Sequence, residues 1–394
     1  MKVQFTRRAS ASLLAMFLLL GASGACSKKE GDGKKAAAQP QVMIVVFASK
    51  AKIIRNGKEI PARVGFMVRA GDVIKTTQGT LDLQTRSGSA IRIKQFTTVS
   101  VTALVDANTR LRLRRGEMLA KVKRSSKSEK FNVVTPTAIA GVRGTTFSVN
   151  YSDDAAPPVI KVMEGRVAMS PRVKALEKFT REDIEKTPAL KKLAAIEKEE
   201  IIIEKETSGT LDANLEKKVK SANKALEGIG KDKTGAVKLD KKVEKIADSI
   251  EKEKKPKLVL KKEKVTDADR ADINTMITVD RKLFDALTKK SAGTSKTADA
   301  AARNEAIKKI SVQRKEQLEK VLKVIESQAS KNTFKTKAEI KKHYNRFERL
   351  VLKNGKVIEG AVIAQTSTVL IIHTKEGVKR VKKDNVDYQD FSVQ

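Results

Sequence analysis

The feature that most constrains the fold is an alternation of apolar and polar residues that runs from residue 42 to about residue 170. Leu111 and Leu113 alternate with arginines, and turn sequences such as Asn56-Gly57 interrupt the pattern at short intervals. Such alternation places apolar side chains on one face of a strand, and Asn-Gly supplies the two positive-φ residues of a tight hairpin turn. We therefore expect many short antiparallel strands in residues 42–170, arranged as a β-sandwich or barrel.

Two regions with other patterns follow. Residues 171–333 are rich in Lys, Glu and Ala, which favour helices, and Thr180 and Thr266 each stand three residues before an aspartate, a sign of a helix start. These helices bury little, so a loose bundle, a helical hairpin and partly disordered arms remain open. Residues 334–394 predict a short helix and five short strands, for which we expect a small SH3-like β-barrel because closure removes exposed strand edges.

The start of the chain predicts export. Basic residues (Lys2, Arg7 and Arg8) precede a short apolar run and a series of small residues that ends at Cys26. This order is typical of a secretory signal, and the run is shorter than the ~20 apolar residues that span a bilayer. Cys26 is the only cysteine, and the segment resembles a relaxed lipobox, in which residues 1–25 are removed and lipid is added to Cys26. An ordinary signal peptide with an unmodified cysteine is the alternative.

Residues 26–41 are rich in Lys, Gly and Ala, and we expect them to form a disordered tether. Ser27 stands where enteric bacteria place the aspartate that retains lipoproteins at the inner membrane. The sequence therefore predicts a lipid-anchored protein of the cell envelope, at the outer rather than the inner membrane. Periplasmic and surface-exposed positions both remain open.

The net charge of the chain indicates which classes of partner it can bind. The chain carries 82 Lys and Arg residues against 47 Asp and Glu, a formal net charge of +35, which predicts attraction to anions. Export and an aromatic content of 4% argue against nucleic acid and favour anionic lipid, lipopolysaccharide, peptidoglycan or another acidic glycan. A solvated surface that binds nothing is the alternative. With two histidines and one cysteine, we expect no metal site, no disulfide, no His-based triad and no cofactor.

The alternating region resembles the FecR domain. Four blocks carry the resemblance, of which the third is the most distinctive: Gly71–Thr76, Leu113–Gly116, Thr135–Ala138 with Val142–Val149, and Val162–Val167. The resemblance implies a β-rich, non-catalytic domain on the periplasmic side of an envelope. FecR-type regulators also carry a cytoplasmic segment and a membrane-spanning helix ahead of this domain. Neither pattern precedes it here, so we do not expect the iron-signalling role to carry over, and the whole arrangement resembles the FecR-domain lipoproteins of spirochaetes.

Basic residues at alternate strand positions are the first candidate site. Each set shares one side of its strand: Arg92 with Lys94; Arg110, Arg112 and Arg114; and Lys121 with Lys123. We expect each set to point away from the core. If the strands are neighbours, they form a cationic surface for phosphate or carboxylate groups, on the order of 1 kcal/mol per basic residue at an anionic membrane. An ordinary solvated face is the alternative.

Arg143 is the second candidate. It lies in the segment Gly141-Val142-Arg143-Gly144. Because glycine permits backbone conformations that other residues avoid, we expect a tight turn that presents the cation of Arg143. The functional interpretation of this turn is a binding site for an anion or a peptide at Arg143. A structural hydrogen bond from its guanidinium to nearby carbonyls is the alternative.

No motif of a phosphate-binding loop, a zinc protease, a serine hydrolase or a kinase is present, so an enzyme is the least favoured class. The first hypothesis is a non-catalytic envelope lipoprotein that binds or scaffolds through the FecR-like domain and a basic surface, with an envelope protein among its partners. The second is a sensor or regulatory component of an envelope signalling system. A binder of anionic glycan or lipopolysaccharide, or a surface protein that contacts a host, is a further alternative.

Overall fold

A computed structural model of the chain describes residues 42–105, 108–123, 130–151, 156–230, 237–252, 258–276, 278–288, 296–366 and 368–390. The predicted signal sequence, Cys26 and the tether lie outside the described residues. Within these ranges, no helix combines the length and the apolar character needed to cross a membrane.

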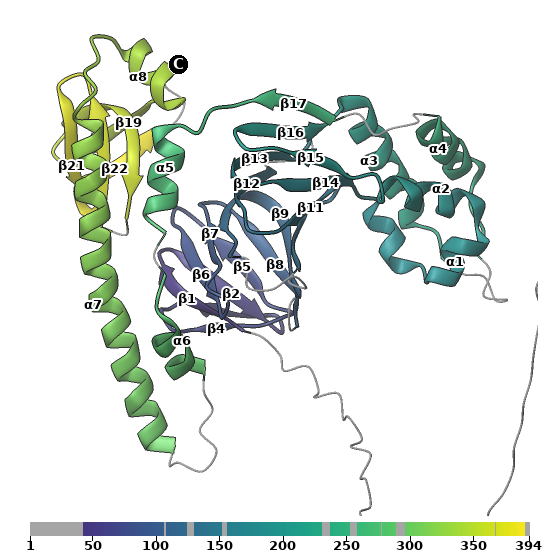
Figure 1. The fold of residues 1–394 in the computed structure, drawn as a ribbon, viewed down its shortest axis with the longest axis horizontal. Coiled ribbons are helices and arrows are strands. Elements are labelled where there is room, and N and C mark those ends of the chain that lie inside the picture. Colours follow the sequence, from purple (N-terminus) through teal and green to yellow (C-terminus); the bar gives the residue numbers. More distant parts are fainter. Residues whose placement is uncertain are drawn as a thin grey trace, which may run out of the picture. The chain divides into compact units, whose positions relative to one another are not determined.

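Two sheets packed face to face form the β-sandwich predicted from the alternation (Figure 1). Sheet A contains, in order of pairing, β3 (Lys58–Pro61), β2 (Ala51–Arg55), β5 (Val73–Thr76), β8 (Thr98–Val105), β9 (Asn108–Lys121), β10 (Lys130–Val134), β11 (Ala138–Val142), β14 (Val167–Pro171) and β15 (Ile201–Ile203). Sheet B contains β4 (Met67–Val68), β1 (Met43–Ala48), β6 (Leu81–Thr85), β7 (Ala90–Ile93), β9 again, β12 (Thr146–Tyr151), β13 (Val159–Glu164), β16 (Thr207–Leu211) and β17 (Leu258–Lys262). The β9–β10 pair is parallel and the other pairs are antiparallel.

Strand β9 belongs to both sheets and changes sheet at Gly116. Its first half pairs with β8 and β10, and its second half pairs with β7 and β12. Gly116 has φ of +97°, and a Cβ at this position would lie 2.2 Å from Oγ1 of Thr97. Only glycine fits this crossing, because an L side chain would meet both a strained backbone and a collision.

Three strands lie in the stretch for which we expected helices alone. The run Ile201–Ile203 pairs with β14, and β16 pairs with both β13 and β17. Both sheets therefore continue past residue 170. The β-branched run at residues 201–203 has strand propensity, but its partner strand lies more than thirty residues earlier in the chain.

The helices α1 (Arg181–Lys186), α2 (Pro188–Ile196), α3 (Ala213–Glu227) and α4 (Lys241–Glu251) follow the sandwich strands. Thr180 caps α1 through a reciprocal pair of hydrogen bonds with Asp183, as its spacing predicts. Apolar residues of α2, α3 and α4 belong to the same buried cluster as the interior of the sandwich. These helices are therefore neither extended arms nor a separate hairpin, because their apolar stripes extend the sandwich core.

A second group of helices covers the outer face of sheet B: α5 (Asp267–Asn274), α6 (Arg281–Thr288) and α7 (Lys296–Ala329). Ile44 and Val46 on β1 pack there against Phe284 of α6 and Ile310 of α7. Farther along α7, Leu322 packs in another cluster, with the C-terminal strands. The apolar stripe of this long helix is thus divided between two cores.

The C-terminal part contains α8 (Lys337–Tyr344) and five strands, as expected. The strands are β18 (Glu348–Leu352), β19 (Val357–Gln365), β20 (Val369–Thr374), β21 (Gly377–Lys382) and β22 (Val386–Asp390). They pair in the order β21-β20-β19-β18-β22. The predicted closed SH3-like barrel is not confirmed, because no pairing among the described strands joins β21 to β22. A break in register between Val362 and Ala364 bends β19 between its two neighbours.

Candidate functional site

The structure divides the predicted basic residues between the two sheets. Because β9 changes sheet at Gly116, Arg110, Arg112 and Arg114 lie in sheet A, whereas Lys121 lies in sheet B beside the strand of Arg92. Arg114, Lys121 and Lys123 are exposed. The three sets therefore do not form one continuous cationic surface.

Arg92 and Lys94 are not on a solvated face. Arg92 is only 6% exposed and donates to both carboxylate oxygens of Asp82 at 2.8 Å. Its guanidinium also donates to the backbone oxygens of Asp272 and Thr275 at the end of α5. The ammonium of Lys94 lies 2.8 Å from Asp272 and 2.9 Å from Glu117. Both side chains point away from the sandwich core, as expected, but the expected exposed cationic face is wrong here because helix α5 covers this part of sheet B.

Arg110 and Arg112 share one carboxylate. Their guanidiniums lie 3.4 and 2.7 Å from Glu177, which also accepts from the buried Arg172 at 2.7 Å. Burial raises the pKa of Glu177, but the hydrogen bond and charge of Arg172 outweigh it, so the pKa lies below its usual range. The carboxylate of Glu177 thus faces three guanidiniums on the outer side of sheet A.

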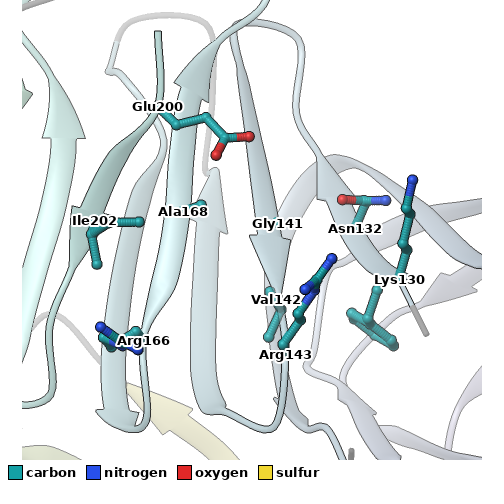
Figure 2. Close-up of a pocket in the computed structure, with 10 residues that line it drawn as sticks. Lys130, Asn132, Gly141, Val142, Arg143, Arg166, Ala168, Glu200 and Ile202 are labelled. Carbon is teal, nitrogen blue, oxygen red and sulfur yellow. The ribbon is translucent and has the colours of Figure 1, made fainter. Parts of the chain in front are cut away.

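Arg143 lines an open groove of about 850 Å³ on the outer face of sheet A (Figure 2). Residues Asn132, Gly141, Ala168 and Ile202 form one row across β10, β11, β14 and β15, because each is paired with the next in register. The small side chains in the middle of the row leave the floor of the groove low.

The ends of the groove carry opposite charges. Arg143 and Arg166 stand at one end and Glu200 at the other, with Lys130, the first residue of β10, along one side (Figure 2). The guanidinium of Arg143 makes no hydrogen bond or ion pair with any residue that the structure describes. A cation without a local partner is available to an external anion.

The turn at Arg143 is held by Thr145. Its hydroxyl donates to the backbone oxygens of Arg143 at 3.2 Å and Arg166 at 2.9 Å, and Gly144 adopts φ of +62°. The alternative role for Arg143, a structural bond that holds the turn, is therefore carried by Thr145 among the described residues. Sequence reasoning missed Thr145 and the low floor at Gly141, although both lie in the Val142–Val149 block or directly before it.

The described residues hold no group of three or more His, Cys, Asp or Glu side chains that could bind a metal ion. The groove offers guanidinium donors at one end, an ammonium and a side-chain amide along one side, and a carboxylate acceptor at the other end (Figure 2).

Comparison with known proteins supports part of the predicted resemblance. Residues 72–168 match the family described as FecR protein, about a quarter of the chain. No match to a curated protein was found. Two crystal structures of a protein of Parabacteroides distasonis assigned as an anti-sigma factor, at 1.65 and 2.50 Å resolution, are similar at 12% identity and a TM-score of 0.30. Each similarity covers 51% of this chain and 64% of that chain. The FecR match includes every residue of the groove from Lys130 to Ala168.

Proposed function

We propose that this chain is a sensor or regulatory component of an envelope signalling system, and that its FecR-like sandwich binds a partner in the groove at Arg143. The FecR match supports this proposal, because FecR proteins are associated with the cell envelope. The observation that carries it is the guanidinium of Arg143, which has no partner among the described residues and lies within the matched segment at the cationic end of a groove.

The groove suits an extended segment with an acidic group. Arg143 and Arg166 provide forked donors for a carboxylate, while Asn132 and Glu200 provide an amide and an acceptor farther along the floor. A matching partner is a segment of an envelope protein with an acidic residue for Arg143 and Arg166 and, farther along, a hydrogen-bond donor for Glu200. The sites predicted at Arg143 and at the β9 arginines thus belong to different parts of sheet A.

The experiment compares transcript levels in a deletion strain and in strains that carry single-copy variants of the full chain. Gly141→Leu fills the floor of the groove, and its Cβ would lie at ordinary contact distances of 3.6–3.9 Å from its nearest neighbours. Arg143→Gln with Arg166→Gln removes two charges from the groove. The matched control, Arg63→Gln with Arg69→Gln, removes two exposed charges elsewhere.

We expect the deletion and both groove variants to change the same transcripts, and the control to behave as the parent. Unchanged transcription in the deletion strain would refute the regulatory role. A deletion effect that neither groove variant reproduces would refute the assignment to the groove.

A second candidate is a binding or scaffolding lipoprotein, anchored at the outer membrane through lipid on Cys26. The basic start, the short apolar run and the lone cysteine favour it, and a lipid chain with a basic surface makes a stable two-part anchor. The test is labelling with palmitate, followed by separation of the inner and outer membranes. Cys26→Ser should lose both the label and the membrane association at high salt, whereas a variant that stays in the detergent phase would exclude this anchor.

A further inference from the structure

A second cavity, of about 660 Å³, lies between helix α3 and the sandwich, where β9, the turn between β10 and β11 and the end of β12 line it. Its basic lining comes from three elements: Arg112 and Arg114 of β9, Arg172 and Lys174 after β14, and Lys220 and Lys224 of α3. Glu227 is the acidic residue of this lining. We call this cavity the α3 cleft.

The positive charge in the α3 cleft exceeds what the neighbouring carboxylates neutralise. Glu177 is shared by Arg112, Arg172 and the adjacent Arg110. Burial lowers the pKa of Arg172, and the charges of Arg112 and Arg110 lower it further. Clustered cations thus destabilise one another's charged forms, an energy that a bound anion would recover.

Three basic residues of the cleft have no carboxylate partner among the described residues. Arg114, Lys174 and Lys224 are exposed, and none of them forms an ion pair with a described residue. Lys220, in contrast, lies 3.1 Å from the buried carboxylate of Glu216. The uncompensated charges therefore come from all three elements that line the cleft.

The walls of the cleft are fixed to each other. Thr137 donates to Glu216 of α3 at 3.0 Å, and Asn223 of α3 accepts from the backbone N–H of Ala175 at 2.9 Å. The ammonium of Lys178 donates to backbone oxygens at the end of α3, among them that of Glu227 at 3.1 Å. A rigid frame of this kind holds the cations close together before a ligand arrives, which reduces the entropy lost on binding.

We infer that the α3 cleft binds a phosphate-bearing group. A carboxylate carries a single charge, and one carboxylate beside the cleft, Glu177, already accepts from Arg112 and Arg172. A phosphate group carries up to two charges and several acceptor oxygens, which match forked guanidiniums and ammonium groups on facing walls. This site is independent of the Arg143 groove, since the two cavities share no lining residue.

The experiment uses the purified full chain and two probes. Pyrophosphate, followed by titration calorimetry at low salt, represents a phosphate group free in solution. Flotation with vesicles of phosphatidylglycerol and phosphatidylcholine, compared with phosphatidylcholine alone, represents a lipid headgroup. The cleft variant is Arg114→Gln/Lys174→Gln/Lys224→Gln, and the matched control is Arg63→Gln/Lys241→Gln/Lys341→Gln, which also removes three exposed charges.

We expect the cleft variant to weaken binding of at least one probe about tenfold or more, the loss expected for one charge-assisted hydrogen bond, while the control changes it little. A loss confined to pyrophosphate assigns the site to soluble phosphate compounds, and a loss confined to the vesicles assigns it to headgroups. Failure of the parent to bind either probe, or equal losses in the cleft variant and the control, would overturn the inference. Gly141→Leu should leave both probes unaffected, which separates this test from that of the groove.

Discussion

Arg92 provides the sharpest test of how the helices are held on sheet B. Its guanidinium makes five hydrogen bonds: two to Asp82 at 2.8 Å, two to backbone oxygens of Asp272 and Thr275 at 2.9 Å, and one to the Thr275 hydroxyl at 2.6 Å. Arg92→Met removes all five and leaves the carboxylate of Asp82, 3% exposed, without its cation. Breaking a buried pair in this way costs about 3–5 kcal/mol of unfolding free energy.

The double variant Asp82→Leu/Arg92→Met should recover most of that loss, because replacing both partners leaves no buried charge. Arg86→Met is the matched control: Arg86 is 55% exposed in its pair with Asp285 at 3.3 Å, and such a surface pair contributes no more than about 1 kcal/mol.

The assay combines urea unfolding, followed by circular dichroism because the chain has no Trp, with hydrogen exchange of the amides of α5. Arg92→Met should lower the unfolding free energy and remove protection from α5 first, since Arg92 binds the carbonyls at the end of that helix. A loss below about 1 kcal/mol, equal to that of the Arg86→Met control, would refute the reasoning. So would a double variant less stable than Arg92→Met.

Three further predictions concern other parts of the chain. Gly116→Ala should cost more than about 2 kcal/mol of unfolding free energy, measured by the same urea assay, because a Cβ there meets Thr97 and the φ of +97° is strained. Lowering the pH from about 7 to about 5.5 should destabilise the parent and not His373→Gln. Burial lowers the pKa of His373 in the folded protein below its ordinary 6.5. In this pH range the unfolded chain therefore binds a proton at His373 that the folded chain does not, and the free energy of unfolding falls as the pH falls. A slope independent of His373 would contradict this. Lys178→Met should increase hydrogen exchange at the C-terminal end of α3, whose carbonyls lose a donor, and unchanged exchange there would show that the cap contributes nothing.

Local sequence patterns predicted the elements whose causes are local. The Asn56-Gly57 turn adopts positive φ at both residues, 50° and 77°, because the turn type depends on those two residues alone. The capping residues Thr180 and Thr266 begin helices, since each bonds to a residue three positions ahead. Strand β16 was missed because its partner β13 lies about fifty residues earlier, and a short Thr/Ser/Gly segment carries no periodic signal of its own.

The candidate sites show the same division. Alternation correctly indicates that Arg92 leaves the sandwich interior, but whether solvent or a helix lies beyond it depends on contacts with Asp272 and Thr275, about 180 residues farther along the chain. The α3 cleft could not be assembled from the sequence either: Lys224 reaches it through the packing of α3 on the sandwich, and Lys174 through the position of β14 in sheet A. The sequence identifies the basic residues themselves, but it does not show which residues lie next to them in the fold.

The two outer faces of the sandwich consequently differ in what they can bind. The part of sheet B that carries Arg92 is occupied by the chain's own helices, and its charges are consumed in ion pairs with Asp82 and Asp272. Sheet A keeps Arg143 and Arg114 without carboxylate partners among the described residues, one in each of two separate cavities. Because an anion gains most where a cation lacks a partner, we expect anionic ligands at these two cavities of sheet A and not at the part of sheet B that carries Arg92. A ligand that protects the backbone amides of β7 from hydrogen exchange, and not those of β11 or α3, would contradict this division.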